Sequence, residues 1–203
     1  MDYSSYKESR DMTWKELINN NINSLPIKIN TICKNRGISL ISYSKGADLI
    51  RYINNGEKYV SNDGFSIGNK IFYNEKCSAE RTRFTIAHEL GHIMLGHTQS
   101  PALINREISP DDSPLETAAN VFASRLLAPA CVLWGIGVTD YHQIQALCSI
   151  SETAARFRME RIDQLYEREQ EFLKRYDKSC FLISPLERQV YEMFAEYIAA
   201  HKL

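Results

Sequence analysis

Two histidines and a glutamate, spaced for metal chemistry, form the most informative stretch of the sequence. The run His88-Glu89-Leu90-Gly91-His92 contains the pattern His-Glu-x-x-His. Residues four apart on a helix lie on the same face, so His88 and His92 can direct two ring nitrogens toward one metal ion. Glu89 lies beside this pair, where it can accept a proton from a water molecule that the metal activates. Nitrogen and oxygen donors of this kind suit zinc.

The residues around this pattern predict the helix that it requires. Ser78 is suited to cap its N-terminus, Glu80 places negative charge in the first turn, and Gly96 is suited to end it. Apolar residues recur between these ends at helical spacing. The alternative is an amphipathic core helix that carries two histidines by coincidence. Unpaired imidazoles on its half-buried face would cost free energy, and this favours the metal interpretation.

A second helix is predicted to begin at Ser113-Pro114 and to end near Pro129. Its Glu116 has two interpretations. Ser-x-x-Glu is a capping box, in which the glutamate bonds back to the cap. Alternatively Glu116 is the third metal ligand, because a catalytic zinc site takes three protein ligands and one helix supplies only two of them. The pattern alone leaves both open. Asn120 follows one turn later on the same face, where it can support a ligand.

The composition is that of an ordinary globular protein. The chain has 203 residues, enough for one moderate domain or a domain with a small satellite. Its net charge of -1 argues against an electrostatic nucleic-acid binder. The five cysteines are scattered, which is typical of reduced thiols in a cytosolic protein. We expect no membrane-spanning run and no signal sequence.

Short strands precede the metal helix and predict an α+β fold. Residues 38–43 are rich in β-forming types, and residues 64–67 and 70–74 have the pattern of a hairpin. The strand Ile71–Asn74 leads directly into the metal helix. We therefore predict that it is an edge strand that binds an extended peptide by strand addition, with an ordinary internal strand as the alternative.

The C-terminal part is predicted to be helical. Residues 138–165 have the rhythm of a helix-turn-helix, and the second helix carries Arg156, Arg158 and Arg161. Interspersed acidic residues dilute this charge and argue against DNA binding. The same shape also serves as a protein-docking module. The sequence thus predicts one domain over residues 1–130 and a helical region over residues 131–203.

Two runs of the sequence resemble a known family. Arg83–His92 and Glu116–Pro129 are similar, in order and separation, to the paired motifs of the ImmA/IrrE metallopeptidases. The resemblance covers residues 38–129 well and the following helical segment more loosely. It implies a zincin-like domain, with a small, partly antiparallel sheet packed on helices. It also implies that His88, His92 and Glu116 bind zinc and that Glu89 is the general base.

His97 and Tyr73 are further candidates near the site. A rival zinc pattern has a third histidine six residues after the second, whereas His97 follows His92 by five. We therefore rank His97 below Glu116 as a ligand and predict a structural or supporting role. Tyr73 and His97 are also candidates, by position only, for stabilising the oxyanion of a peptidase reaction.

The resemblance also implies a partner. Members of the family typically act on a helix-turn-helix repressor, often encoded alongside, and so relieve repression of a mobile element or a stress response. We therefore expect a cytosolic zinc endopeptidase that cleaves such a repressor. One alternative is a metal-stabilised regulatory or toxin-antitoxin module that acts by binding, without turnover. Another is direct DNA binding through the C-terminal arginines.

Overall fold

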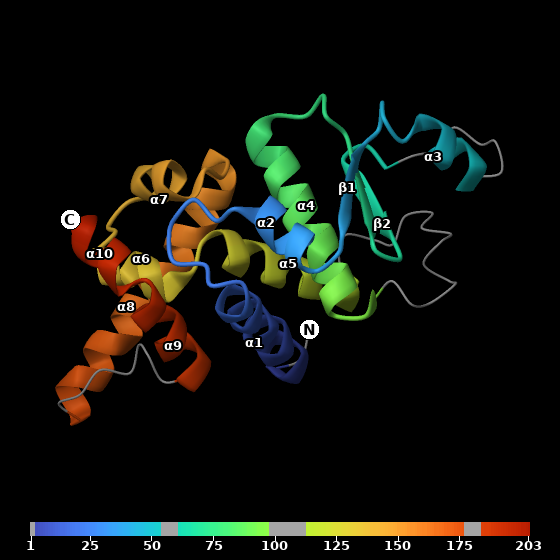
Figure 1. Cartoon of the computed structure of the whole chain (residues 1–203). Coiled ribbons are helices and arrows are strands. Elements are labelled where there is room, and N and C mark those ends of the chain that lie inside the picture. The colour runs from blue at the N-terminus through green and yellow to red at the C-terminus, as the bar shows by residue number, and fades with distance from the viewer. Residues whose placement is uncertain (1–2, 54–60, 98–112, 177–183) are drawn as a thin grey trace. The chain divides into compact units, whose positions relative to one another are not determined.

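The structure is a computed structural model that describes residues 3–53, 61–97, 113–176 and 184–203 (Figure 1). The chain forms two compact units. One comprises Met1–Met12 and Ile29–Ala123, and the other Thr13–Lys28 and Ser124–Leu203. Helices with a small mixed sheet confirm the predicted α+β class. The predicted division into residues 1–130 and 131–203 stays a prediction.

A three-stranded sheet lies in the first unit. Its strands are β1 (Ser39–Ser42), β2 (Gly64–Ile67) and β3 (Lys70–Tyr73), in the spatial order β1-β3-β2. β2 and β3 are antiparallel, whereas β1 and β3 are parallel. Gly68 adopts a positive φ of 55° in the connection between β2 and β3, which glycine allows without steric cost. The predicted hairpin is therefore confirmed, and the sheet is partly antiparallel as expected.

The prediction that Ile71–Asn74 forms an edge strand is wrong. β3 is the central strand and is paired on both sides, so its backbone groups are not available to an added peptide. The successive residues Ile71 and Phe72 are both fully buried, because the two faces of β3 are both covered. A continuous apolar run of this kind is typical of an internal strand.

The first unit also contains helices. They are the first part of α1 (Tyr3–Asn19), α2 (Ile29–Asn35), α3 (Ala47–Ile53), α4 (Ala79–Met94) and the first part of α5 (Pro114–Leu127). The Ser78 side chain accepts a hydrogen bond from the backbone N–H of Arg81, so Ser78 caps α4 as predicted. The helix ends before Gly96, which has a φ of 76°.

Two glycines let neighbouring elements approach α4 closely. A Cβ at Gly64 would lie 2.5 Å from Cγ2 of Thr85 and 2.7 Å from the carbonyl oxygen of Phe72. A Cβ at Gly91 would lie 3.0 Å from Cδ1 of Phe122. β2 therefore packs directly on one side of α4 and α5 on another (Figure 1). These contacts set the distances across the functional site described below.

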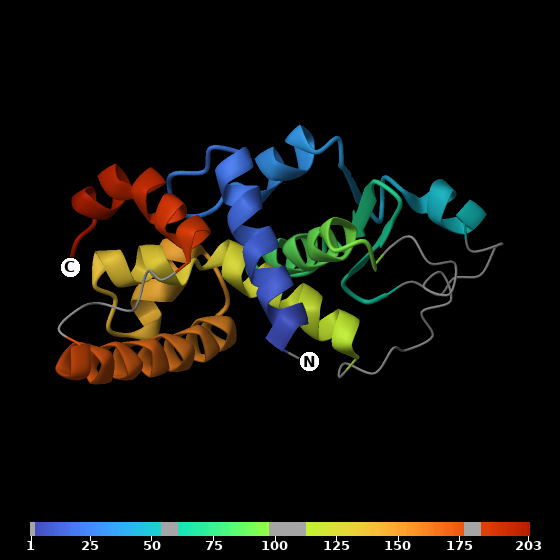
Figure 2. The same cartoon turned by 90° about the horizontal axis from the view of Figure 1, so that it is seen from below.

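The second unit is helical in the part of the chain that the structure describes. After the end of α1 (Tyr3–Asn19) and α5 it contains α6 (Ala130–Ile136), α7 (Tyr141–Cys148), α8 (Glu152–Tyr176), α9 (Pro185–Met193) and α10 (Ala195–Ala200). α7 packs along α8, while α6 contacts α9 and α10 (Figure 2). Trp14, Leu133 and Phe194 are fully buried in its core.

The arginines of α8 do not form one open surface. Arg158 is 5% exposed, and its Nε donates a hydrogen bond to the carbonyl oxygen of Ala128 at 2.7 Å. Arg156 is bonded to Glu152 on its own helix, at 2.8 Å. Phosphate contacts need accessible cations, so Arg158 does not serve the DNA-binding alternative.

The segment Pro114–Ile136, which contains α5 and α6, is long and apolar enough to cross a membrane by length and composition. The expectation that no segment approaches the length and composition of a membrane helix therefore does not hold for this segment. In the structure, 72% of its most apolar window is buried. Burial of this extent is equally a property of core helices in globular proteins.

Replacing Arg81 by Ala tests the ion pair that joins α4 to the segment before β2. Nε and Nη2 of Arg81 donate to the two carboxylate oxygens of Asp63 at 2.5 and 2.6 Å. The hydrogen bond from Arg81 lowers the pKa of Asp63. The pair therefore stabilises the fold above the unfolded pKa of an aspartate, about 3.9, and its contribution disappears as the pH falls through the lower folded pKa.

We expect Arg81→Ala to lower the free energy of unfolding at pH 7 by about 0.2–1 kcal/mol, because the pair is partly solvated. Urea denaturation at several pH values measures the difference, which should shrink below about pH 4. Arg51→Ala is the control, since the pair of Arg51 with Asp48 is more exposed and longer, at 3.6 Å. An equal loss at pH 7 and pH 3 would contradict the ion-pair account.

Candidate metal centre

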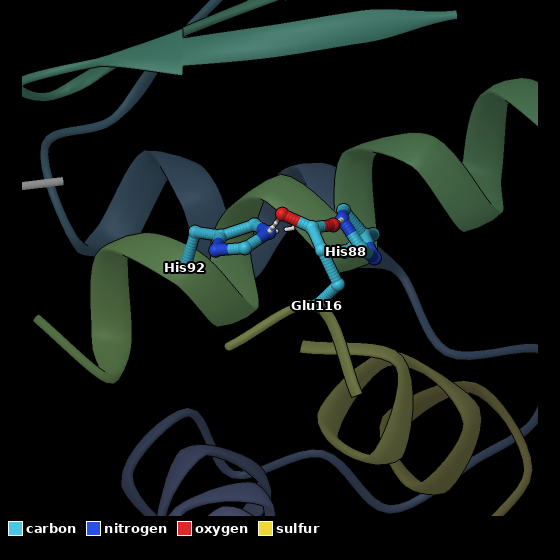
Figure 3. A group of neighbouring side chains, drawn as sticks. All are labelled: His88, His92 and Glu116. Atoms are coloured by element: carbon cyan, nitrogen blue, oxygen red, sulfur yellow. Dashed lines mark hydrogen bonds and ion pairs between the residues drawn. The ribbon is translucent and has the colours of Figure 1, made fainter. Parts of the chain in front are cut away.

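Three side chains from two helices meet at one point. His88 and His92 lie on one face of α4, and Glu116 comes from the first turn of α5 (Figure 3). One carboxylate oxygen of Glu116 is 3.0 Å from Nε2 of His88, and the other is 3.4 Å from Nε2 of His92. The two Nε2 atoms are 3.0 Å apart. The potential ligand atoms all lie within 4.8 Å of one another, so this group could hold a metal ion.

The sequence left open whether Glu116 caps α5 or binds a metal. In the structure Ser113 caps the helix, and the Glu116 side chain points to the histidines. The side chain of Ser113 accepts a hydrogen bond from the backbone N–H of Glu116 at 3.2 Å, which caps the start of α5. The carboxylate of Glu116 contacts the two histidines. Capping by Ser113 therefore leaves the Glu116 side chain available to the site, although its role as a ligand stays a prediction.

Asn120 and His97 contact the ring nitrogens that point away from this meeting point. Nδ1 of His88 is 2.9 Å from Oδ1 of Asn120, and Nδ1 of His92 is 3.0 Å from Nδ1 of His97. Where each Nδ1–H donates to its partner, the lone pair of Nε2 faces the site. Such contacts fix the tautomer and the ring orientation of metal-binding histidines. Both residues were singled out from the sequence, and the structure places both beside the histidines.

The charges of the site favour an ionised Glu116. Its hydrogen bonds with His88 and then His92 hold its pKa well below the usual range of a carboxyl group. For His88, burial alone would lower the pKa. The hydrogen bond with Glu116 and the charges of Glu89 and Glu116 outweigh that effect and raise the pKa of His88. At neutral pH the carboxylate of Glu116 is therefore ionised beside the rings of His88 and His92.

Glu89 is buried next to the histidines and has a partner that the sequence did not reveal. It is 3% exposed, and its Oε2 accepts a hydrogen bond from the hydroxyl of Ser66 in β2 at 2.6 Å. A buried carboxylate needs such a donor to offset its desolvation. A single serine in a short strand carries no local signal of this contact. Only the packing of β2 on α4 brings the two residues together.

Tyr73 lies on the face of the sheet that is directed toward α4. It pairs with Gly64 across the β2–β3 ladder, just as Ile71 pairs with Ser66. Residues directly opposite each other, and residues two apart on a strand, share a face. Since Ser66 reaches Glu89 of α4, Tyr73 is on the same side of the sheet. Its role at the site stays a prediction.

The donor set fits a metal of borderline softness. Two imidazole nitrogens and one carboxylate are a combination that catalytic zinc sites use, with a further position left for water or substrate. His92 is fully buried, and the side chains of His88 and Glu116 are 15% and 17% exposed. The site is therefore shielded on the His92 side and reachable from the side of His88 and Glu116.

Comparison with known proteins agrees with this chemistry. The family model described as the IrrE N-terminal-like domain, a peptidase family, matches residues 48–160, which is more than half of the chain. The matched region contains the whole His88, His92 and Glu116 group. No curated protein matches the chain. The resemblance to the ImmA/IrrE metallopeptidases is thereby confirmed.

Removing either residue behind the histidines should weaken metal binding without abolishing it. We expect His97→Ala and Asn120→Ala each to lower zinc affinity about 10- to 100-fold, because the ring of His92 or His88 loses the bond that orients it. Competition with a chromophoric chelator measures the affinity. His142→Ala, at an exposed histidine of α7, is the control. Wild-type affinity in both variants would show that these contacts do not orient the ligands.

Proposed function

The chain belongs to the IrrE N-terminal-like family of metallopeptidases, and from this premise we propose that it is a zinc-dependent endopeptidase. The observation that carries the proposal is the convergence of His88, His92 and Glu116, with the buried Glu89 beside them. Two imidazoles and a carboxylate from two helices are the ligand set of a catalytic zinc site. A structural zinc site would instead have four protein ligands.

Each residue has a distinct part in the proposed reaction. His88, His92 and Glu116 would hold the zinc, which would supply a Lewis acid that polarises the scissile carbonyl and lowers the pKa of water. Glu89 accepts the proton of the attacking water and later donates it to the leaving amine. Asn120 and His97 keep the rings of His88 and His92 in the orientation that directs Nε2 inward. Burial of Glu89 keeps its carboxylate out of bulk solvent, where it would be less well oriented.

We propose that the substrate binds as an extended peptide along β2 instead of β3. Among the strands that the structure describes, β1 and β2 are the two edge strands, each paired on one side only, by β3. Ser66 of β2 is bonded to Glu89, so the outer edge of β2 runs past the proposed base. Backbone groups on such an edge can pair with a peptide strand. This position replaces the one first predicted for the substrate.

The proposed substrate is a helix-turn-helix repressor, whose cleavage would relieve repression of a mobile element or a stress response. This proposal is supported by the resemblance of residues 83–92 and 116–129 to the ImmA/IrrE motifs and by the family match. It places the protein in the cytoplasm, where such repressors act. Among the described residues, Cys33, Cys77, Cys131 and Cys148 form no disulfide, as we would expect in a reducing compartment.

Replacing Glu89 by Gln should abolish cleavage and leave zinc binding intact. The amide keeps the size of the side chain and its bond with Ser66 but cannot accept a proton as a base, which typically costs at least about 100-fold in rate. The measurement compares new protein N-termini in source cells that carry the wild-type chain, the Glu89→Gln variant or neither. We expect new N-termini from a helix-turn-helix repressor with the wild type alone.

The same experiment distinguishes the peptidase proposal from the alternative that the protein is a binding module. A module that acts without turnover would produce no new N-termini, and its Glu89→Gln variant would keep the full biological effect. Lys70→Gln, at a residue of β3, is a control for expression and handling. Retained derepression by the Glu89→Gln variant would contradict the peptidase proposal.

A further inference from the structure

We infer that Ser66 is a positioning residue that holds the carboxylate of Glu89 in its working orientation. The inference rests on the proposed function, since it assumes that Glu89 is the base. Ser66 lies in β2, the strand along which the substrate is proposed to bind. One residue would thus connect the substrate-binding strand with the base.

The contact between the two side chains is short and directional. The Ser66 hydroxyl is 2.6 Å from Oε2 of Glu89. A carboxylate can only accept from it, so the hydroxyl donates. This length is in the range of about 2.5–2.7 Å that is typical of a hydroxyl bonded to a charged carboxylate. The bond is made to Oε2, so in the proposed reaction Oε1 would accept the proton of the attacking water.

The register between β2 and α4 explains why Ser66 can reach Glu89. Gly64 contacts Thr85, and two residues later Ser66 contacts Glu89, four residues after Thr85. Two residues of a strand span about 6.6 Å, and four residues of a helix span about 6 Å. The strand and the helix therefore meet at two matching points. Gly64 makes the approach possible, since a Cβ there would collide with Thr85 and with the carbonyl of Phe72.

Without the hydrogen bond from Ser66, the side chain of Glu89 would populate several orientations. Its side chain has rotatable bonds that a single contact can restrict, and loss of a productive orientation slows a reaction even when every group is present. The competing view is that Ser66 merely offsets the burial of Glu89. On that view its loss would lower stability but would not change the orientation or the rate.

The test uses the full chain, loaded with zinc, with Ser66 replaced by Ala or by Thr. Threonine keeps the hydroxyl and suits a strand. The first readout is the carboxyl ¹³C resonance of Glu89, identified as the one lost in Glu89→Gln, recorded at fixed pH without substrate. The second is the yield of wild-type-dependent new N-termini in source cells at matched protein levels. Ser39→Ala, at an exposed serine of β1, is the control.

We expect Ser66→Ala to shift the Glu89 resonance and to lower cleavage about tenfold, while zinc stoichiometry stays at the wild-type value. Ser66→Thr should restore both readouts, and Ser39→Ala should change neither. An unmoved resonance, or wild-type cleavage by Ser66→Ala, would overturn the role of Ser66 and leave the proposed function standing. Absence of cleavage by the wild-type chain would overturn the proposed function, and with it the role of Ser66.

Discussion

The close packing of α4 against α5 is the contact on which the rest of the site depends. Gly91 lies within the His-Glu-x-x-His run, and the ring of Phe122 lies against it where any larger residue would place its Cβ. Phe122 follows Glu116 by six residues on α5. The contact of its ring with Gly91 therefore also limits how far Glu116 can lie from the histidines. His88, His92 and Glu116 come from two helices, so this group stays together only while the approach is maintained.

Polar partners behind the site then restrict each functional group. Asn120 and His97 contact the outer nitrogens of His88 and His92, and Ser66 contacts Glu89. In a poorly hydrated interior an unpaired polar group is costly, so these bonds both stabilise the fold and select one orientation for each side chain. The site is thereby organised before any substrate binds, which lowers the reorganisation that the reaction requires.

How far the sequence predicts the structure depends on the range of the interactions involved. α4, its Ser78 cap and the shared face of His88 and His92 follow from residues within one helix, and all are present. The position of Glu116 beside the histidines could not be chosen from spacing alone, because it depends on packing between helices. The resemblance to a family supplied that information.

The two failures near the site have the same physical origin. β3 was predicted to be an edge because it adjoins α4, but its parallel partner β1 lies about thirty residues earlier in the chain. Pairing between strands so far apart in the sequence leaves no local pattern of residues that would reveal it. Ser66 was missed because its partner Glu89 is 23 residues away, across a strand and a turn. Residues that act through tertiary contacts can be identified only once the fold is known.

Metal analysis of the purified chain tests the central claim most directly, together with His88→Ala and Glu116→Ala variants. The account predicts one zinc per chain in the wild type and lost or clearly weakened zinc in both variants, because each removes one of three protein ligands. A wild type without zinc after reconstitution, or a Glu116→Ala variant that binds zinc as the wild type does, would contradict it.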